Sequence, residues 1–227
     1  MNKIVEKEYF SERVVKLVVE APLIARSRRP GHFVIVRCGD KGERIPLTIA
    51  DADVKAGTIT LVVQAVGAST EAICALSPGD CLTDVAGPLG RATDVSRCGT
   101  VVCCGGGVGV APLLPIIRAM KASGNRVISV LAARNKDLII LENQVRDSSD
   151  EVIIMTDDGS YGEKGVVTAP LDKKIVEGAN FDEVITIGPL IMMKFVVKTT
   201  KPHGVKTVVS MNPIMVDGTG MCGGCRL

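Results

Sequence analysis

The chain has 227 residues, which allows one large domain or two small ones with buried cores. Its 27 basic and 25 acidic residues leave a net charge of only +2, which argues against nucleic acid or an anionic membrane as the main partner. Hydrophobic residues make up 46% of the chain and tryptophan is absent. Because these hydrophobic residues are mostly aliphatic, the composition suits β-strands and buried parallel sheets.

The cysteines and the N-terminus indicate a protein of the reducing cytoplasm. The first ten residues, MNKIVEKEYF, are charged throughout and lack the pattern of a signal peptide. Residues 99–117 carry no charge, but their five glycines and two prolines favour a strand, a turn and a helix start over a membrane span. Six of the eight cysteines lack the spacing of a secreted disulfide scaffold, and we expect them to be small buried hydrophobic residues: Cys38, Cys74, Cys81, Cys98, Cys103 and Cys104.

The first part of the chain has the pattern of an antiparallel β structure. Short β-branched runs are separated by proline, glycine and aspartate, and one short helix interrupts them over about 69–76. A further strand follows the PGD turn at 78–80. This rhythm predicts a small antiparallel β-barrel over residues 1–96. The main predicted strands are 13–20, 32–38, 44–51 and 57–66.

After about residue 97 the pattern changes to alternating strands and helices. Such alternation predicts βαβ units on a parallel sheet, which is a nucleotide-binding architecture, over residues 97–210. Residues 211–227 form a glycine-rich tail that resembles neither part. The predicted strands are 100–104, 126–133, 151–156, 182–188 and 205–210, and the predicted helices are 112–123, 137–146, 166–176 and 190–201.

A glycine-rich segment, CCGGGVGVAP, lies between the first predicted strand and helix of the second part. Glycines at this position allow a phosphate to approach backbone N–H groups at a helix N-terminus, and Pro112 suits a first helical turn. The spacing differs from the usual G-x-G-x-x-G fingerprint, and a tight connection without a ligand is the alternative. The candidate pyrophosphate residues are Gly105, Gly106, Gly107, Val108, Gly109 and Pro112.

Three further loops follow predicted parallel strands, where α/β domains bind ligands. Arg134 follows the second strand, where an arginine tolerates a ribose 2′-phosphate and an acid would bind the 2′-hydroxyl; an ordinary exposed arginine is the alternative. The loop TDDGSYGEKG offers Asp157, Asp158 and Gly159, or is a solvated turn. The junction IGPLIMMK offers Gly188 and Pro189, whereas its two methionines fit core packing.

In the first part, two short segments are candidate ligand contacts only in combination with the second part. RIPLT provides an arginine, an apolar pair and a hydroxyl within five residues, 44–48. VGAST, 66–70, opens the helix of this part with hydroxyl groups. Taken alone, Arg44 fits a surface residue and Ser69 fits a helix cap.

The combination of these motifs resembles the ferredoxin–NADP reductase family of flavoproteins. Within that family, ERIPLTIAD, AGPLG, GGGVGVAPLLPI, TDDGSYGEKG and NPIMVDGTGMCGGCR resemble one branch over essentially the whole chain. This branch comprises the small subunits of NADH-dependent ferredoxin:NADP reductases, also known as sulfide dehydrogenase subunits. It is related to the electron-transfer subunit of dihydroorotate dehydrogenase.

The resemblance implies FAD in the barrel, NAD(P)H in the second domain and a C-terminal [2Fe–2S] module. It places Arg44 at the FAD pyrophosphate and Thr48, the predicted catalytic residue, near the reactive edge of the flavin. Arg44 precedes Thr48 by four residues rather than the family's three, which leaves the role of Arg44 open. The remaining flavin contacts implied by the resemblance are Pro46 and Leu47 against the ring, with Val63, Gln64, Gly67, Ser69 and Thr70.

The tail fits the same resemblance as part of an iron–sulfur site. Plant-type [2Fe–2S] sites begin C-x₄-C-x₂-C, and here four residues separate Asp217 from Cys222, which is followed by Cys225. The predicted metal ligands are therefore Asp217, Cys222 and Cys225, with a turn residue as the alternative for Asp217. The family's fourth ligand lies further along than Leu227, so we expect an incomplete or absent cluster in these 227 residues.

The expected function is electron transfer between NAD(P)H and a larger iron–sulfur flavoprotein subunit, with ferredoxin or a sulfur compound as the redox partner. The electron-transfer subunit of dihydroorotate dehydrogenase is one alternative. A non-catalytic nucleotide-binding or zinc-binding module is another. The cofactor supplies the chemistry, and only two histidines are present, so no general acid–base set is expected.

Overall fold

A computed structural model describes residues 2–211 and 213–227. The chain divides into two compact units. The barrel unit comprises Met1–Thr93 and Asn212–Leu227, and the sheet unit comprises Asp94–Met211. The C-terminal tail therefore groups with the barrel strands rather than with the sheet that precedes it in the chain.

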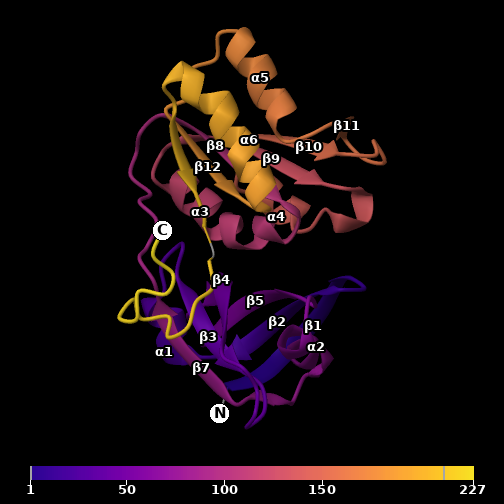
Figure 1. The fold of residues 1–227 in the computed structure, drawn as a ribbon, viewed down its shortest axis with the longest axis vertical. Helices are drawn as coiled ribbons and strands as arrows, with labels where there is room; N and C mark the ends of the chain where they lie inside the picture. Colours follow the sequence, from indigo (N-terminus) through magenta and orange to yellow (C-terminus); the bar gives the residue numbers. More distant parts are fainter. Residues whose placement is uncertain (1, 212) are drawn as a thin grey trace. The chain divides into compact units, whose positions relative to one another are not determined.

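The barrel unit is built on one seven-stranded sheet in the order β6-β1-β2-β5-β4-β3-β7, with every neighbouring pair antiparallel. The sheet curls into a nearly closed barrel, drawn in indigo to magenta in Figure 1. Its strands are β1 (Asn2–Ser11), β2 (Val14–Glu20), β3 (Phe33–Arg37), β4 (Ile45–Asp53), β5 (Thr58–Gln64), β6 (Cys81–Leu82) and β7 (Asp84–Leu89). Two short helices, α1 (Pro22–Ser27) and α2 (Ala68–Ala75), complete the unit.

The strands form because their apolar residues alternate with polar ones, so that one face of the sheet is buried. In β2, Val15, Leu17 and Val19 are at most 1% exposed and pack in the barrel core, whereas Lys16 and Val18 between them are half-buried. The predicted strands 13–20, 32–38, 44–51 and 57–66 correspond to β2, β3, β4 and β5.

The charged N-terminus forms β1, a strand that the sequence analysis did not predict. It pairs with β2 over most of its length and with β6 at its start. Ile4 is fully buried in the barrel core, while Lys16 of β2 bridges Glu6 and Glu8 at 2.8 and 2.7 Å. The charged side chains thus lie on the outer face of the sheet, where ion pairs connect β1 to β2. These charges interrupt the hydrophobic pattern by which the other strands were predicted.

The sheet unit contains a six-stranded sheet in the order β11-β10-β9-β8-β12-β13, and all its pairs are parallel. The strands are β8 (Thr100–Gly106), β9 (Arg126–Ala133), β10 (Glu151–Thr156), β11 (Glu163–Lys164), β12 (Glu183–Ile187) and β13 (Lys206–Val209). The helices are α3 (Val110–Ala122), α4 (Glu142–Arg146), α5 (Thr168–Val176) and α6 (Leu190–Thr200), with 3₁₀ turns η1 (Gly107–Gly109), η2 (Lys136–Leu138) and η3 (Lys201–His203).

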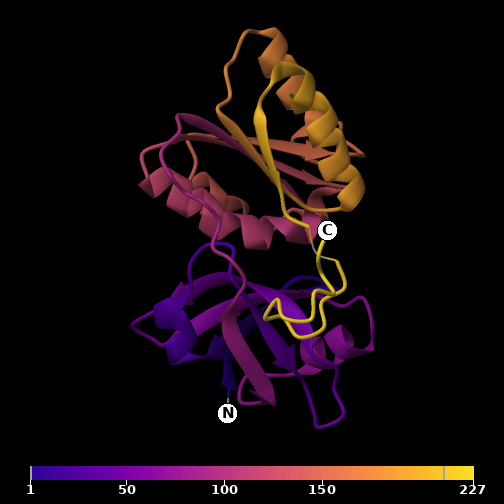
Figure 2. The same ribbon diagram turned by 60° about the vertical axis from the view of Figure 1, so that its left-hand side comes forward.

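Helices cover both faces of this sheet, so its strands are apolar on both sides. Figures 1 and 2 show α3 and α4 on one face and α5 and α6 on the other. Val102 and Cys104 pack with Leu171 of α5 and Val196 of α6 in one core cluster. Val101 and Cys103, which alternate with them, are also fully buried.

One predicted helix, 137–146, is broken in the structure. The turn η2 and the helix α4 replace it, separated by Leu141, which has a φ of 57°. A left-handed conformation at a leucine interrupts helical hydrogen bonding, so the apolar pattern of this segment indicated a longer helix than the backbone permits. The other predicted helices of the sheet unit agree with the structure to within two residues at each end.

The cysteines differ in their surroundings more than the sequence indicated. Cys103 and Cys104 are buried, and burial raises the pKa of the Cys104 thiol to about 12. Cys98, however, is exposed, and Cys38, Cys74 and Cys81 are half-buried. All eight are free thiols in the described parts of the chain. Within residues 2–211 and 213–227, no helix has both the length and the apolar character needed to span a membrane.

Candidate functional site

The strands β4 and β5 separate part of the way along the barrel. Ile49–Asp53 of β4 pair with Thr58–Leu61 of β5, whereas residues 45–48 of β4 pair only with β3. In the described chain, residues 45–48 of β4 and 62–64 of β5 therefore have no ladder partner on the sides that face this split. Unpaired backbone N–H and C=O groups at such edges are suited to the polar rim of a planar ligand.

The predicted flavin contacts of β4 divide between the two faces of the strand. Ile45 and Leu47 pack against the barrel core, whereas Pro46 is exposed and Thr48 is half-buried. Since successive side chains of a strand point to opposite faces, Pro46 and Thr48 share the outer face. Arg44, directly before β4, is also exposed. Leu47, predicted to lie against the flavin ring, is half-buried and packs its side chain against the core.

The helix α2 begins immediately beyond the split and has the features of a phosphate cradle. Gly67 is its N-cap in an extended conformation, and a Cβ added there would meet no described atom within 4 Å. The Thr70 hydroxyl oxygen accepts the N–H groups of Val66 and Gly67 at 2.9 and 3.0 Å, which shapes the turn. Ser69 donates its hydroxyl to Glu43 Oε2 at 3.2 Å. Thr70 thus organises the loop, while Ser69 faces an anion.

The two residues predicted from β5 differ in accessibility. Val63 is fully buried in the core, and its carbonyl accepts a hydrogen bond from Cys74 Sγ at 3.8 Å. Gln64, the last residue of β5, is half-buried. Arg13, which sequence reasoning did not select, donates to the carbonyl of Ala65 at 3.1 Å and supports this end of β5.

In the sheet unit, the glycine-rich segment joins β8 to α3. Gly105 and Gly106 end β8, Gly107 has a φ of 53°, and Gly109 is the N-cap of α3. No side chain caps α3, and the turn η1 leads directly into it, with the Val110 N–H donating to the Gly107 carbonyl. Pro112 is the third residue of α3, a first-turn position where its missing N–H leaves no hydrogen bond unmade.

The order of the parallel strands identifies where this glycine segment meets a second loop. The chain runs outward from β8 to β9 and β10, and then returns to place β12 on the other side of β8. A topological switch point therefore lies between β8 and β12, where open α/β sheets bind ligands. A Cβ on Gly109 would lie 2.5 Å from the Ile187 carbonyl oxygen, and one on Gly188 would lie 3.1 Å from Gly106. Only glycines allow these two loops to touch backbone to backbone.

The loop that follows β9 and the loop that follows β10 are hydrogen-bonded to each other. The amides of Asp157 and Asp158 donate to the carbonyls of Ala133 and Arg134 at 3.1 and 3.3 Å. Asp158 accepts the Ser160 N–H at 2.9 Å, and hydrogen bonds from Ser160 hold the pKa of its carboxyl below the ordinary value. Asp158 thus shapes its own turn. Arg134 is exposed, and Gly159 has the φ of 77° that the turn requires.

Sequence reasoning missed a polar network that supports these loops. The Tyr161 hydroxyl donates to Glu142 Oε1 at 2.9 Å, and Arg146 donates to the same oxygen at 2.8 Å. Thr156 Oγ1 accepts the Tyr161 N–H at 3.2 Å, and Lys136 lies over the tyrosine ring. The single tyrosine in the TDDGSYGEKG segment was the one signal in the sequence that could have indicated it.

The C-terminal tail does not gather the three predicted metal ligands. Asp217 accepts the N–H groups of Thr219 at 2.8 Å and Cys222 at 3.0 Å, and these hydrogen bonds lower the pKa of its carboxyl. Cys222 is exposed and Cys225 is half-buried. Gly218 packs against Ile35 of the barrel. Within the described residues, no group of three or more histidine, cysteine, aspartate or glutamate side chains could hold a metal ion.

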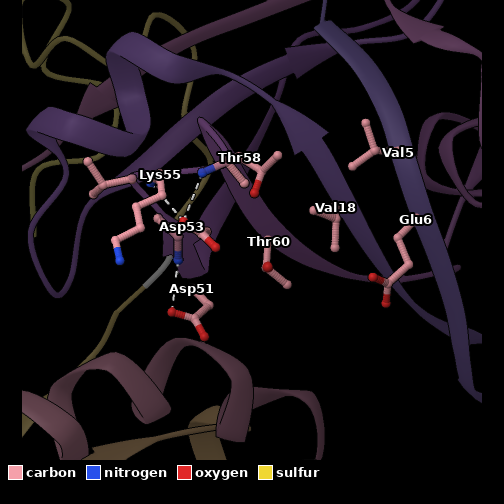
Figure 3. Close-up of a pocket in the computed structure, with 11 residues that line it drawn as sticks. Val5, Glu6, Val18, Asp51, Asp53, Lys55, Thr58 and Thr60 are labelled. Carbon is pink, nitrogen blue, oxygen red and sulfur yellow. Dashed lines mark hydrogen bonds between the residues drawn. The ribbon is translucent and has the colours of Figure 1, made fainter.

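A separate open groove of about 740 Å³ lies on the barrel unit, over β1, β2, β4 and β5 (Figure 3). Asp53, one of its acids, is already hydrogen-bonded to the amides of Lys55 and Ala56 at 2.8 and 2.9 Å. None of the predicted site residues lines this groove. The features expected of a cofactor site thus lie at the split between β4 and β5 and at the switch point, and not in this groove.

The chain is similar to known electron-transfer subunits. No protein-family model matches it. It is 45% identical over 227 residues to a dihydroorotate dehydrogenase B (NAD⁺) electron transfer subunit homolog of Thermotoga maritima, a match that covers all of this chain and 80% of that protein. It is 33% identical to the dihydroorotate dehydrogenase B electron transfer subunit of Streptococcus pneumoniae, covering 99% of this chain and 87% of the relative.

Solved structures are also similar to this chain. The structure of an NADH-dependent reduced ferredoxin-NADP oxidoreductase matches with a TM-score of 0.94 and 44% identity, over 99% of this chain and 81% of the other. A cytochrome P450 reductase of Amycolatopsis, at 20% identity, shares the fold with a TM-score of 0.74 over 92% of this chain and 68% of the other. With its nearly closed barrel and its parallel sheet, the chain has the ferredoxin reductase-like fold and belongs to the family of dihydroorotate dehydrogenase B electron transfer subunits and their homologs.

Proposed function

We propose that the protein binds FAD in the barrel unit and a nicotinamide dinucleotide in the sheet unit, and passes electrons to a larger partner subunit. Its membership in a family of electron transfer subunits establishes a flavin-based electron-transfer role. The observation that supports FAD in the barrel is the split between β4 and β5 beside the open N-terminus of α2. When bound, FAD would supply both hydride and one-electron chemistry.

The residues of the barrel fit the shape and charge of such a cofactor. The free edges of β4 and β5 provide backbone donors and acceptors for the polar edge of a flavin ring. Pro46 presents an apolar surface, and Thr48, on the same outer face, presents a hydroxyl beside it. The start of α2 favours a phosphate because its amides and the helix dipole are directed at the same place.

The sheet unit fits a dinucleotide at its switch point. The glycine segment that leads into α3 would bind a pyrophosphate, since a Cβ on Gly107 would meet no described atom within 4 Å, whereas Gly105, Gly106 and Gly109 are in close contact with other protein atoms. Gly188 and Pro189, packed against Gly106, would border the nicotinamide end. Arg134, Asp157, Asp158 and Gly159 would border the adenosine end, with Asp158 positioning the loop rather than contacting the ligand.

We propose the ferredoxin:NADP reductase branch as the main interpretation and a partner of dihydroorotate dehydrogenase as the alternative. The chain is 44% identical to the NADH-dependent ferredoxin-NADP oxidoreductase chain and 45% identical to the Thermotoga maritima homolog of the dihydroorotate dehydrogenase B subunit, so sequence identity does not separate the two. The name of that oxidoreductase favours NADH as the reductant, whereas Arg134 itself is compatible with NADPH. A ferredoxin or a sulfur compound would be the corresponding redox partner.

We retain the [2Fe–2S] cluster as a prediction for Asp217, Cys222 and Cys225. Its support is the spacing of the three residues and the exposure of Cys222. The residues are not gathered as a metal site, and the Asp217 carboxylate is engaged by backbone amides. The same arrangement does not favour the zinc-binding alternative.

Visible spectroscopy of the purified protein tests the proposal. We expect FAD to bind and its absorption to bleach anaerobically with NADH or NADPH, and the faster of the two identifies the reductant. Iron and sulfide analysis of the same sample is expected to give less than one [2Fe–2S] cluster per chain. A protein that binds no flavin would contradict the proposed function, and a full complement of cluster would contradict only the prediction for the tail.

A further inference from the structure

Tyr161 connects three segments of the sheet unit near the loops proposed to bind the adenosine end of the nucleotide. It lies in the loop between β10 and β11, and its side chain is half-buried. The hydroxyl donates to Glu142 Oε1, at the start of α4, at 2.9 Å, and Lys136 Nζ of η2 lies 5.6 Å from the ring centroid. One side chain thus joins the segment after β9 and the start of α4 to the loop after β10.

Both ends of this connection are held in place. Thr156, the last residue of β10, is fully buried, and its Oγ1 donates to the Tyr161 carbonyl at 2.7 Å and accepts the Tyr161 N–H at 3.2 Å. The backbone of Tyr161 is therefore tied to the parallel sheet. At the other end, Glu142 accepts a second hydrogen bond from Arg146, one helical turn later, at 2.8 Å. The tyrosine side chain spans two anchored points.

The segments that Tyr161 joins are the loops that carry the candidate adenosine contacts. Two backbone hydrogen bonds of 3.1 and 3.3 Å link residues 157–158 to residues 133–134. A third bond follows, in which the Lys136 N–H donates to Ser160 Oγ at 2.9 Å. Residues 157–160 are exposed, so little packing holds them. Tyr161 is the half-buried residue at the end of this run, where its side chain fixes both loops.

We propose that Tyr161 is a positioning residue for the nicotinamide nucleotide, and that its hydrogen bond to Glu142 holds the loops after β9 and β10 in the conformation that binds the adenosine end. This inference rests on the proposed binding of the nucleotide in the sheet unit. When only a fraction of the molecules has the binding conformation, the apparent Kd rises by the inverse of that fraction. The strands β9 and β8 separate β10 from β12, beside which the nicotinamide end is proposed to lie. The hydrogen bond therefore affects affinity and not the rate of hydride transfer.

Anaerobic stopped-flow reduction of bound FAD by NADH, or by NADPH if that is faster, tests the proposal in the wild type and in Tyr161→Phe. Phenylalanine keeps the ring beside Lys136 and the backbone bonds to Thr156, and removes only the hydroxyl. We expect the Kd of the nucleotide to rise about fivefold and the limiting rate of flavin reduction to stay as in the wild type. Reduced nicotinamide mononucleotide, which has no adenosine, is expected to reduce both proteins with the same second-order rate constant.

The matched control is Tyr9→Phe, at the only other tyrosine of the chain. Tyr9 lies on β1 of the barrel unit and also has a lysine amine over its ring, that of Lys7 at 4.7 Å. Because this variant makes the same chemical change outside the sheet unit, we expect the nucleotide Kd to be unchanged.

Two substitutions at Glu142 separate the hydrogen bond from general effects on folding. Glutamine keeps an oxygen that can accept the Tyr161 hydroxyl, so we expect the Kd in Glu142→Gln to stay within about twofold of the wild type. Alanine has no acceptor, and Glu142→Ala is expected to raise the Kd as Tyr161→Phe does.

The outcomes distinguish the inference from the function on which it rests. An unchanged nucleotide Kd in Tyr161→Phe would overturn the proposal. An equal loss with the mononucleotide, or an equal loss in Glu142→Gln and Glu142→Ala, would also overturn it, since the effect would then not come from this hydrogen bond acting on the adenosine end. A wild-type protein whose FAD is reduced by neither NADH nor NADPH would contradict the proposed function itself.

Discussion

At the scale of single residues, the sheet unit depends on one glycine for close approach rather than for an unusual backbone conformation. Gly109 has a φ of −62°, which any residue adopts. A Cβ there would lie 2.5 Å from the carbonyl oxygen and 2.8 Å from the carbonyl carbon of Ile187. Because both are backbone atoms, no side chain can move aside, and the loops at the switch point would have to separate.

We therefore expect Gly109→Ala to destabilise the protein by about 1–3 kcal/mol and to weaken nicotinamide nucleotide binding. Gly67→Ala is the control for stability, since its added methyl group enters open space and its cost is expected to be about 1 kcal/mol or less. Urea unfolding and nucleotide titration measure the two effects. Wild-type stability in Gly109→Ala would show that the loops are not in contact as described.

At the scale of elements, the carboxylate of Asp150, the residue before β10, is bonded to residues of both β9 and α3 in the sheet unit. Asp150, just before β10, accepts the Val127 N–H of β9 at 2.8 Å and pairs with Lys121 of α3 at 2.5 Å. The hydrogen bond from Lys121, followed by that from Val127, lowers the pKa of this carboxyl from its ordinary value of 3.8. A carboxyl with a lowered folded-state pKa stabilises the fold above its unfolded-state pKa and loses that contribution as the pH falls.

We expect Asp150→Asn to lower the free energy of unfolding at pH 7 by about 1 kcal/mol, a value discounted for solvent screening of the ion pair. The deficit relative to wild type should shrink as the pH falls below about 4, where the wild-type carboxyl becomes protonated. Urea unfolding at pH 7 and pH 3 checks both. Asp147→Asn, at an exposed neighbour in the same loop, is the control, and an equal deficit at both pH values would contradict the role of the charge.

At the scale of the whole molecule, the two units have separate cores and separate candidate sites. The barrel core contains residues such as Leu17 and Leu61, and one core cluster of the sheet unit contains Val102 and Val196. Each ligand should therefore stabilise the unit that binds it, by mass action on that unit's unfolding. At a ligand concentration of one hundred times Kd this amounts to about 2.7 kcal/mol.

Hydrogen exchange followed by mass spectrometry checks this expectation. FAD should slow exchange in residues 45–48 and 62–70 of the barrel unit, and NAD⁺ should slow it in residues 105–110 and 187–190 of the sheet unit. Riboflavin serves as the control for the phosphate cradle, since it should protect residues 45–48 but not 67–70. FAD protection confined to the sheet unit would contradict the assignment of the sites.

Most candidate site residues could be identified from the sequence, because glycine, proline and hydroxyl residues are conspicuous where a strand leads into a helix. The resemblance to the ferredoxin–NADP reductase family, drawn from those motifs, is confirmed by the relatives and the solved structures. The individual contacts stay predictions. Leu47 shows why: a motif gives the order of residues along a strand, but the side that each one faces depends on which face the barrel buries.

The sequence by itself determined the two architectures, because hydrophobic periodicity differs between an alternating barrel strand and a strand buried on both faces. Only the tertiary structure decided which residues of distant segments are in contact. Glu43 and Ser69 meet, and Gly109 and Ile187 meet, because sheet topology brings distant loops together. The strand β1 pairs with β2, buries Ile4 in the core and places Glu6 and Glu8 against Lys16. These contacts join residues far apart in the chain, so local sequence patterns do not specify them.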